Sequence, residues 1–176
     1  MGMVPILINQ DGSRQSPLVI DGLRIDLGGQ AAVRDVSIAL ESHSIHGLVG
    51  NSGSGKTLTS LAAVGLLPRG GSASGSIRLA GMEEDLLDID ERTWPSIRGL
   101  KIGYVGQNAL GCLHPAFRVG WQVVEAIRRH QRMSRRDAHS SMLEQLAAVD
   151  LQDPERVARS RPAQLSGTLP QPASAR

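Results

Sequence analysis

Cysteine is nearly absent from this sequence of 176 residues, in which Cys112 stands alone. One thiol cannot form an intramolecular disulfide, and a metal site built from several cysteines is excluded. This usage is typical of a reducing compartment. Aromatic residues are almost as scarce, with two tryptophans, one tyrosine and one phenylalanine. The core must therefore be built mainly from Leu, Ile, Val and Ala.

Long apolar runs are also missing. No stretch approaches the ~18 apolar residues that a membrane-spanning helix needs. The first 12 residues lack the basic start and apolar run of a signal peptide. We therefore expect a cytoplasmic protein whose membrane association comes through a partner. The formal net charge of +2 is too small to indicate nucleic-acid binding.

The apolar pattern predicts an antiparallel hairpin near the start of the chain and helices towards its end. Two alternating segments, Leu18–Leu27 and Ala31–Leu40, flank a Gly-Gly pair that favours a turn. The remaining expected elements are strands at Ser44–Val49, Ser76–Ala80 and Ile102–Val105, a Gly/Ser-rich loop at Arg69–Gly75, and helices at Lys56–Leu67 and Gly120–His130.

A further helix is predicted after Ser134, which stands three residues before Asp137 as a capping pair. The residues expected on its packed face are Ala138, Met142, Leu146 and Val149. Residues 1–17, rich in Gly, Ser, Gln and Pro, are expected to be a flexible leader. Residues 168–176 contain two prolines and no pattern, so we expect an aberrant tail there.

One motif carries recognisable chemistry, the phosphate-binding pattern G-x-x-x-x-G-K-[ST]. Its residues are Gly50, Asn51, Ser52, Gly53, Ser54, Gly55, Lys56 and Thr57. Glycines let successive backbone N–H groups face one anion, the lysine neutralises β- and γ-phosphates, and the hydroxyl can ligate Mg²⁺. The alternative is a flexible loop beside a chance Lys-Thr pair. It is disfavoured because an apolar segment precedes the motif and a helical one follows.

From about Leu18 to Gly167 the sequence resembles the ABC ATPases, specifically the dipeptide, oligopeptide and nickel importer group. Beyond the phosphate-binding motif, the resemblance is carried by the stretch from Lys56 to Pro68, by Ser74–Arg78 and by Ile97–Gln107. It implies an α/β fold, that of a P-loop NTPase with an N-terminal antiparallel β-subdomain and a helical subdomain at about residues 109–164. The implied cofactors are ATP and Mg²⁺.

The resemblance also assigns roles to residues whose type and position alone indicate no function. Gln107 matches the family's Q-loop glutamine, which with Thr57 is implied at the Mg²⁺ site and senses the transmembrane partner. Leu165, Ser166 and Gly167 match the start of the signature motif, which closes over the nucleotide held by a second subunit.

The sequence departs from the family pattern in three places. Leu27 stands where the family places an aromatic under the adenine ring, which implies weaker stacking. Thr168 replaces the second signature glycine, and two prolines oppose the helix that should follow. No apolar strand ending in Asp-Glu and no switch histidine follow. The resemblance therefore implies a partial domain, 18–167, truncated within the signature motif, with the C-terminal half of its core missing.

The implied function is the ATP-binding subunit of an ABC importer for peptides or a related small solute such as nickel. Its implied partners are transmembrane permease subunits, a second ATP-binding subunit and, indirectly, an extracytoplasmic solute-binding protein. The implied location is the inner face of the cell membrane. The alternative is a nucleotide-binding fragment without a role in transport, or an inactive truncated product.

We predict that the 176-residue chain alone does not hydrolyse ATP at a meaningful rate. Losing one preorganised donor costs roughly 10²–10³ in rate, and several catalytic groups of the family have no counterpart in this sequence. The measurement is phosphate release by the purified chain. Steady release that disappears in Lys56→Ala would contradict the prediction.

Overall fold

The central element of the sheet is β1 (Leu18–Leu27), which is flanked by β2 (Gln30–Ala39) on one side and β3 (Gly71–Leu79) on the other. Strand β2 (Gln30–Ala39) follows it through the turn at Gly28 and Gly29, whose φ angles are 56° and 82°. Both values lie in the left-handed region, which glycine adopts without steric cost. Leu27 pairs with Gln30 across this turn, so the predicted antiparallel hairpin is confirmed.

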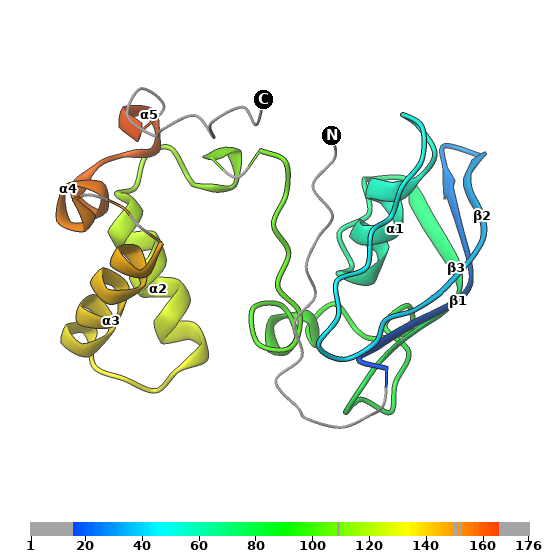
Figure 1. The fold of residues 1–176 in the computed structure, drawn as a ribbon, viewed down its shortest axis with the longest axis horizontal. Helices are drawn as coiled ribbons and strands as arrows, with labels where there is room; N and C mark the ends of the chain where they lie inside the picture. The colour runs from blue at the N-terminus through cyan, green and yellow to red at the C-terminus, as the bar shows by residue number, and fades with distance from the viewer. Residues whose placement is uncertain (1–15, 109, 150, 152, 166–176) are drawn as a thin grey trace. The chain divides into compact units, whose positions relative to one another are not determined.

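Figure 1 shows the computed structural model, which describes residues 16–108, 110–149, 151 and 153–165. The chain forms two units, divided between Gly106 and Gln107, and each is treated by itself below. Most of the predicted leader, residues 1–15, and the whole predicted tail, residues 168–176, lie outside the described part.

Strand β3 (Gly71–Leu79) is longer than the sequence predicted and runs antiparallel along the other edge of β1. The expected loop at Arg69–Gly75 is wrong for most of its length, because Gly71 and Ser72 already pair with β1. Glycine and serine have low strand propensity, but a neighbouring strand that offers backbone partners overrides it.

Helix α1 (Lys56–Ala63) ends four residues before its predicted end at Leu67. Gly65, with φ of 62°, donates its N–H to the Ala62 carbonyl, and the Leu66 N–H reaches back to Leu61. These two bonds form the Schellman arrangement that ends helices. A Cβ on Gly65 would lie 2.2 Å from the Trp94 ring, so the stop at this position also depends on packing.

The core of the first unit lies between the sheet and α1, which is drawn alongside the sheet in Figure 1. Leu23, Ile25 and Ile77 are fully buried on the sheet, and Ala62 and Ala63 of α1 join them. A short 3₁₀ helix, η1 (Trp94–Ser96), completes this core.

Two predicted strands do not form. Residues Ser44–Val49 are extended but belong to no strand, and Ile45 and Val49 are 86% and 93% exposed. Within Ile102–Val105, only Ile102 makes an isolated parallel bridge, to Arg98. Both runs are apolar enough for strands, but strands need backbone partners, and no strand among the described residues pairs with either run.

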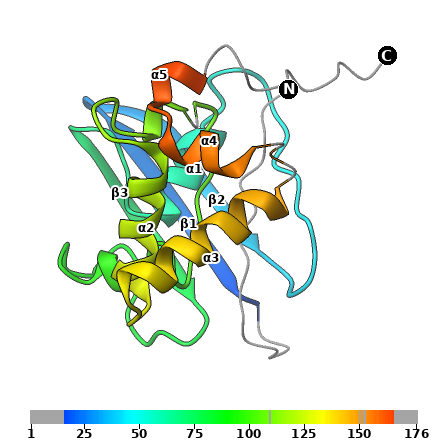
Figure 2. The same ribbon diagram turned by 90° about the vertical axis from the view of Figure 1, so that its left-hand side faces the viewer.

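The described part of the second unit is helical. Its elements are η2 (Leu110–Cys112), α2 (Val119–His130), α3 (Arg135–Ala148), α4 (Pro154–Arg159) and α5 (Pro162–Leu165). Helices α2 and α3 lie side by side in Figure 1 and Figure 2. None of the helices among the described residues is long and apolar enough to cross a membrane.

The predicted cap of α3 is confirmed, since the Ser134 hydroxyl accepts the Asp137 N–H at 3.2 Å. Ala138 and Met142 are fully buried and Leu146 is partly buried against them, as the periodicity predicts. The placement of Val149 on this packed face is wrong. The helix ends at Ala148, and Val149 is 67% exposed.

Asp85 ties the turn after β3 to the strand itself. Its carboxylate accepts the Ser76 hydroxyl at 2.5 Å and the N–H groups of Ile77 and Leu87 at 3.0 and 2.9 Å. Partial burial raises the pKa of Asp85, but these hydrogen bonds and the charge of Arg78 outweigh it. The pKa therefore lies below its ordinary value of 3.8.

Asp85→Ala is expected to lower the free energy of unfolding by about 2 kcal/mol, because hydrogen bonds to a charged acceptor contribute about 1.5–3 kcal/mol. Since the folded pKa is the lower one, this stabilisation is present above pH 3.8 and is lost as the pH falls through the folded pKa. Urea unfolding from neutral pH to about pH 3 measures both effects. The exposed Asp88→Ala is the control, and an equal loss in both variants would contradict the assignment.

Candidate phosphate-binding site

The loop from Gly50 to Gly55 joins the extended segment before it to the first turn of α1 (Figure 1). Gly53 and Gly55 have φ angles of 79° and 85°, in the left-handed region. Gly55 is the N-cap of α1, with ψ near 0°, and no side chain caps the helix. The glycines of the motif therefore curl the backbone, as the sequence predicts.

Close packing requires glycine at the end of the loop. A Cβ on Gly55 would lie 2.6 Å from Val33 Cγ2 and 3.0 Å from the Ala32 carbonyl oxygen, both on β2. A Cβ on Gly50 would lie 2.8 Å from Ser54 Oγ. The loop is thus pressed against the sheet at one end and folded on itself at the other.

Lys56 holds the loop from inside. Its Nζ donates to the carbonyl oxygens of Gly50 and Asn51 at 2.7 and 2.6 Å, and lies 3.2 Å from Ser54 Oγ. The three donors of an ammonium group are thereby all directed into the loop. A positive charge sits at the concave centre of the motif.

The start of α1 has unused donors. Among the described residues, none accepts a hydrogen bond from the backbone N–H groups of Gly55, Lys56 or Thr57. The first turn carries no acidic side chain. Unpaired N–H groups and the helix dipole both favour an anion at this end. With the ammonium beside them, these groups can bind phosphate.

Thr59 is a positioning residue that the sequence reasoning missed. Its side chain is 4% exposed, and its Oγ1 donates to the Gly55 carbonyl oxygen at 3.1 Å. The bond fixes the N-cap residue at the mouth of the loop. A threonine four residues after a glycine N-cap is a weak signal, because threonine often bonds a carbonyl one turn earlier in helices.

The structure brings together the motif from Gly50 to Thr57, with Thr57 exposed on the first turn of α1. Gln107 is exposed at the start of the second unit. Its approach to the loop stays a prediction. Leu165 is buried at the end of α5. The signature residues Ser166 and Gly167 lie outside the described residues. Over the described part of the chain, no three His, Cys, Asp or Glu side chains are grouped to hold a metal.

The site combines a glycine-rich loop that leads into a helix, a lysine in the first turn of that helix, and the sheet beside it. These features define an α/β protein of the P-loop class. A sequence profile described as ABC transporter matches residues 33–171. The chain belongs to this family.

Curated relatives carry names from peptide transport. Over 145 residues the chain is 39% identical to the oligopeptide transport ATP-binding protein OppD of Mycobacterium tuberculosis, covering 82% of this chain and 23% of that protein. A putative peptide import ATP-binding protein of Brucella abortus is 40% identical over 171 residues, with coverage of 92% and 51%. A probable D,D-dipeptide transport ATP-binding protein of Escherichia coli is 35% identical over 146 residues, with coverage of 82% and 44%. The chain spans about half the length of these relatives, or less.

Gly55→Ala is expected to destabilise the first unit more than Gly53→Ala. Both positions have positive φ, which costs an alanine about 1–2 kcal/mol. A Cβ at Gly53 meets nothing within 4 Å, whereas at Gly55 it meets Val33. Overpacking there adds about 1–3 kcal/mol. Thermal unfolding of both variants measures the difference, and equal losses would contradict the packing argument.

Proposed function

We propose that this chain is the ATP-binding part of an ABC importer that takes up peptides or a related small solute. The observation that carries the proposal is that the ammonium group of Lys56 lies inside the loop, while the backbone N–H groups at the start of α1 donate no hydrogen bond to any described residue. Positive charge and converging donors are what a nucleotide's phosphates require.

The residues present fit a phosphate chain. Glycine at Gly50 and Gly55 avoids collisions with Ser54 and Val33 and so permits the loop to curl, and the space beside Gly53 is open, since a Cβ there would meet nothing within 4 Å. Gly53, Ser54 and Gly55 would supply backbone donors, Ser54 by exchanging the Asn51 carbonyl oxygen, to which its N–H donates at 3.2 Å, for a phosphate oxygen. Lys56 would exchange the carbonyl oxygens of its own loop for phosphate oxygens, which are negatively charged and therefore stronger acceptors.

The same residues fit a magnesium ion that comes with the nucleotide. Thr57 presents a hydroxyl oxygen, the type of ligand that Mg²⁺ prefers, at the exposed start of α1. The family resemblance makes Gln107 a second candidate ligand. When bound, the ion would neutralise phosphate charge.

The role in peptide import rests on the relatives, whose names assign them to oligopeptide, dipeptide or peptide transport. It implies permease subunits in the membrane and a second ATP-binding subunit as partners. Co-purification of such a permease with the chain supports the role, whereas nucleotide binding without a permease favours a nucleotide-binding fragment outside transport.

Lys56→Ala is expected to weaken the binding of a non-hydrolysable ATP analogue with magnesium by about 10- to 150-fold. Hydrogen bonds to charged groups contribute about 1.5–3 kcal/mol, which corresponds to this range in Kd. Isothermal titration of the two proteins measures the change.

Lys101→Ala is the matched control, because its ammonium group bonds only the Gly81 carbonyl among the described residues, at 3.2 Å. The control should bind the analogue as the wild type does. Equal weakening in both variants, or no binding by folded wild-type protein, would contradict the proposal.

A further inference from the structure

A segment rich in arginine, residues 128–136, joins α2 to α3 in the second unit, and we call it the basic turn. Figure 1 and Figure 2 show it at the opposite end of this helix pair from α5. The segment contains five arginines, and all five are exposed. They are Arg128, Arg129, Arg132, Arg135 and Arg136.

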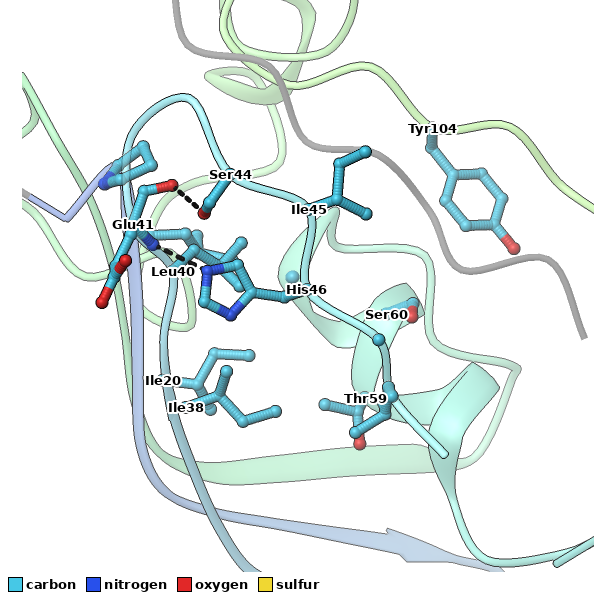
Figure 3. Close-up of a pocket in the computed structure, with 15 residues that line it drawn as sticks. Ile20, Ile38, Leu40, Glu41, Ser44, Ile45, His46, Thr59, Ser60 and Tyr104 are labelled. Carbon is cyan, nitrogen blue, oxygen red and sulfur yellow. Dashed lines mark hydrogen bonds between the residues drawn. The ribbon is translucent and has the colours of Figure 1, made fainter. Parts of the chain in front are cut away.

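Positive charge is concentrated around the basic turn. Residues 118–139 hold six arginines and two carboxylates, whereas the whole chain has a formal net charge of only +2, so the rest of the chain is net acidic. The groove of the first unit drawn in Figure 3 is lined mainly by apolar side chains such as Ile20 and Ile38, and no arginine or lysine is among its described lining residues. An anionic surface would therefore be attracted to the basic turn and not to that groove.

The stability of the helices does not explain all of these arginines. Arg128 and Arg129 lie in the last turn of α2, where cations interact favourably with the helix dipole. Arg135 and Arg136 occupy the first two positions of α3, where a positive charge opposes the dipole. Because two cations at that end weaken α3, binding explains them better than folding does.

Few carboxylates neutralise the basic turn. Among the described residues, its one ion-pair partner is Glu125, whose Oε1 lies 3.6 Å from a nitrogen of Arg128 and 3.9 Å from one of Arg135. A guanidinium group is a planar fork of donors that fits two oxygens of one phosphate. Within the described part of the chain, three arginines have neither an ion pair nor a side-chain hydrogen bond: Arg129, Arg132 and Arg136.

An aromatic ring lies beside the basic turn. Trp121 of α2 and Arg135 of α3 line the same pocket of about 210 Å³, together with Arg118 and Arg159. Trp121 stacks on Phe117 with 4.5 Å between the ring centroids, and it is still 41% exposed. Exposed tryptophan next to cationic side chains is typical of protein surfaces that lie in the headgroup region of a bilayer.

We propose that the basic turn binds the anionic phospholipids of a membrane surface directly, without a permease between them. The unpaired guanidinium groups would bond phosphate oxygens of the headgroups, and clusters of about four to eight basic residues are typical of such binding. Of the five arginines only Arg135 lines the pocket, so the others form an open surface, which favours a lipid layer over an acidic protein segment. The inference goes beyond the proposed function and does not depend on nucleotide binding.

Co-sedimentation of the full chain with lipid vesicles, in the absence of nucleotide, tests the proposal. One set of vesicles contains phosphatidylglycerol and phosphatidylcholine in equal parts, and the other contains phosphatidylcholine alone. We expect the chain to sediment with the anionic vesicles only. Binding should be lost in about 1 M salt, where the Debye length falls to about 3 Å.

The combined variant Arg129→Gln, Arg132→Gln and Arg136→Gln should weaken binding to the anionic vesicles by about 100-fold. The contribution of one arginine near an anionic surface corresponds to about fivefold in the binding constant, and three such contributions multiply to this change. Titration with increasing lipid measures it. Circular dichroism verifies that the variant is folded, as expected for three exposed side chains.

The matched control combines Arg34→Gln, Arg69→Gln and Arg92→Gln, three exposed arginines of the first unit. Both triple variants remove three positive charges from a chain with a formal net charge of +2, so only the place of the loss differs. The control should retain most of the vesicle binding. Lys56→Ala should bind vesicles as the wild type does, because its ammonium group bonds its own loop. This variant separates the inference from the proposed nucleotide binding.

Any of four results would overturn the proposal. The first is folded chain that does not sediment with the anionic vesicles, or that sediments equally with phosphatidylcholine alone. The second is equal weakening in the two triple variants. The third is loss of vesicle binding in Lys56→Ala, which would assign the lipid phosphates to the nucleotide site. The fourth is binding of a polyglutamate peptide to the basic turn without binding to vesicles, since an acidic protein segment would then be the partner.

Discussion

The hydrogen bonds from Lys56 to the carbonyl oxygens of Gly50 and Asn51 are the interaction on which the candidate site depends. They draw a positive charge into the centre of a loop whose own carbonyl groups would otherwise repel phosphate. At the other end of the loop, Gly55 packs against Val33 of β2 and begins α1. The loop is therefore anchored both to the sheet and to the helix, and its geometry follows from theirs.

Strand pairing in the sheet makes the contact between Gly55 and β2 rigid. Because β1 is paired along both edges, the β2 backbone that meets Gly55 is held by its pairing with β1, in which Ile25 lies opposite Val33. Helix α1 packs its alanines on the same core and is closed at its far end by Arg98, whose guanidinium donates to the carbonyl oxygens of Val64 and Gly65. The charged side chain also stacks on Trp94, 4.4 Å from the ring centroid. Both ends of α1 are thus defined by specific contacts.

Predictions from sequence succeeded where the signal was local. The Gly-Gly turn specified the first hairpin, and Ser134 with Asp137 specified the start of α3, because turn and cap geometries depend on a few neighbouring residues. They failed where pairing decided the outcome. Residues 71–75 became strand because β1 offered an edge, and Ser44–Val49 did not because no described strand lies beside it.

The sequence by itself determined the phosphate-binding motif, the family and the sites of the main helices, since each depends on residue type at fixed spacing. Only the tertiary structure decided how the motif is used. It showed that Lys56 bonds its own loop, that Thr59 fixes the N-cap carbonyl, and that Gly55 must be glycine because Val33 lies against it. The contact between Gly55 and Val33 joins residues that are distant in the chain, and the two hydrogen bonds depend on the conformation of the folded loop, so residue type and spacing alone do not specify them.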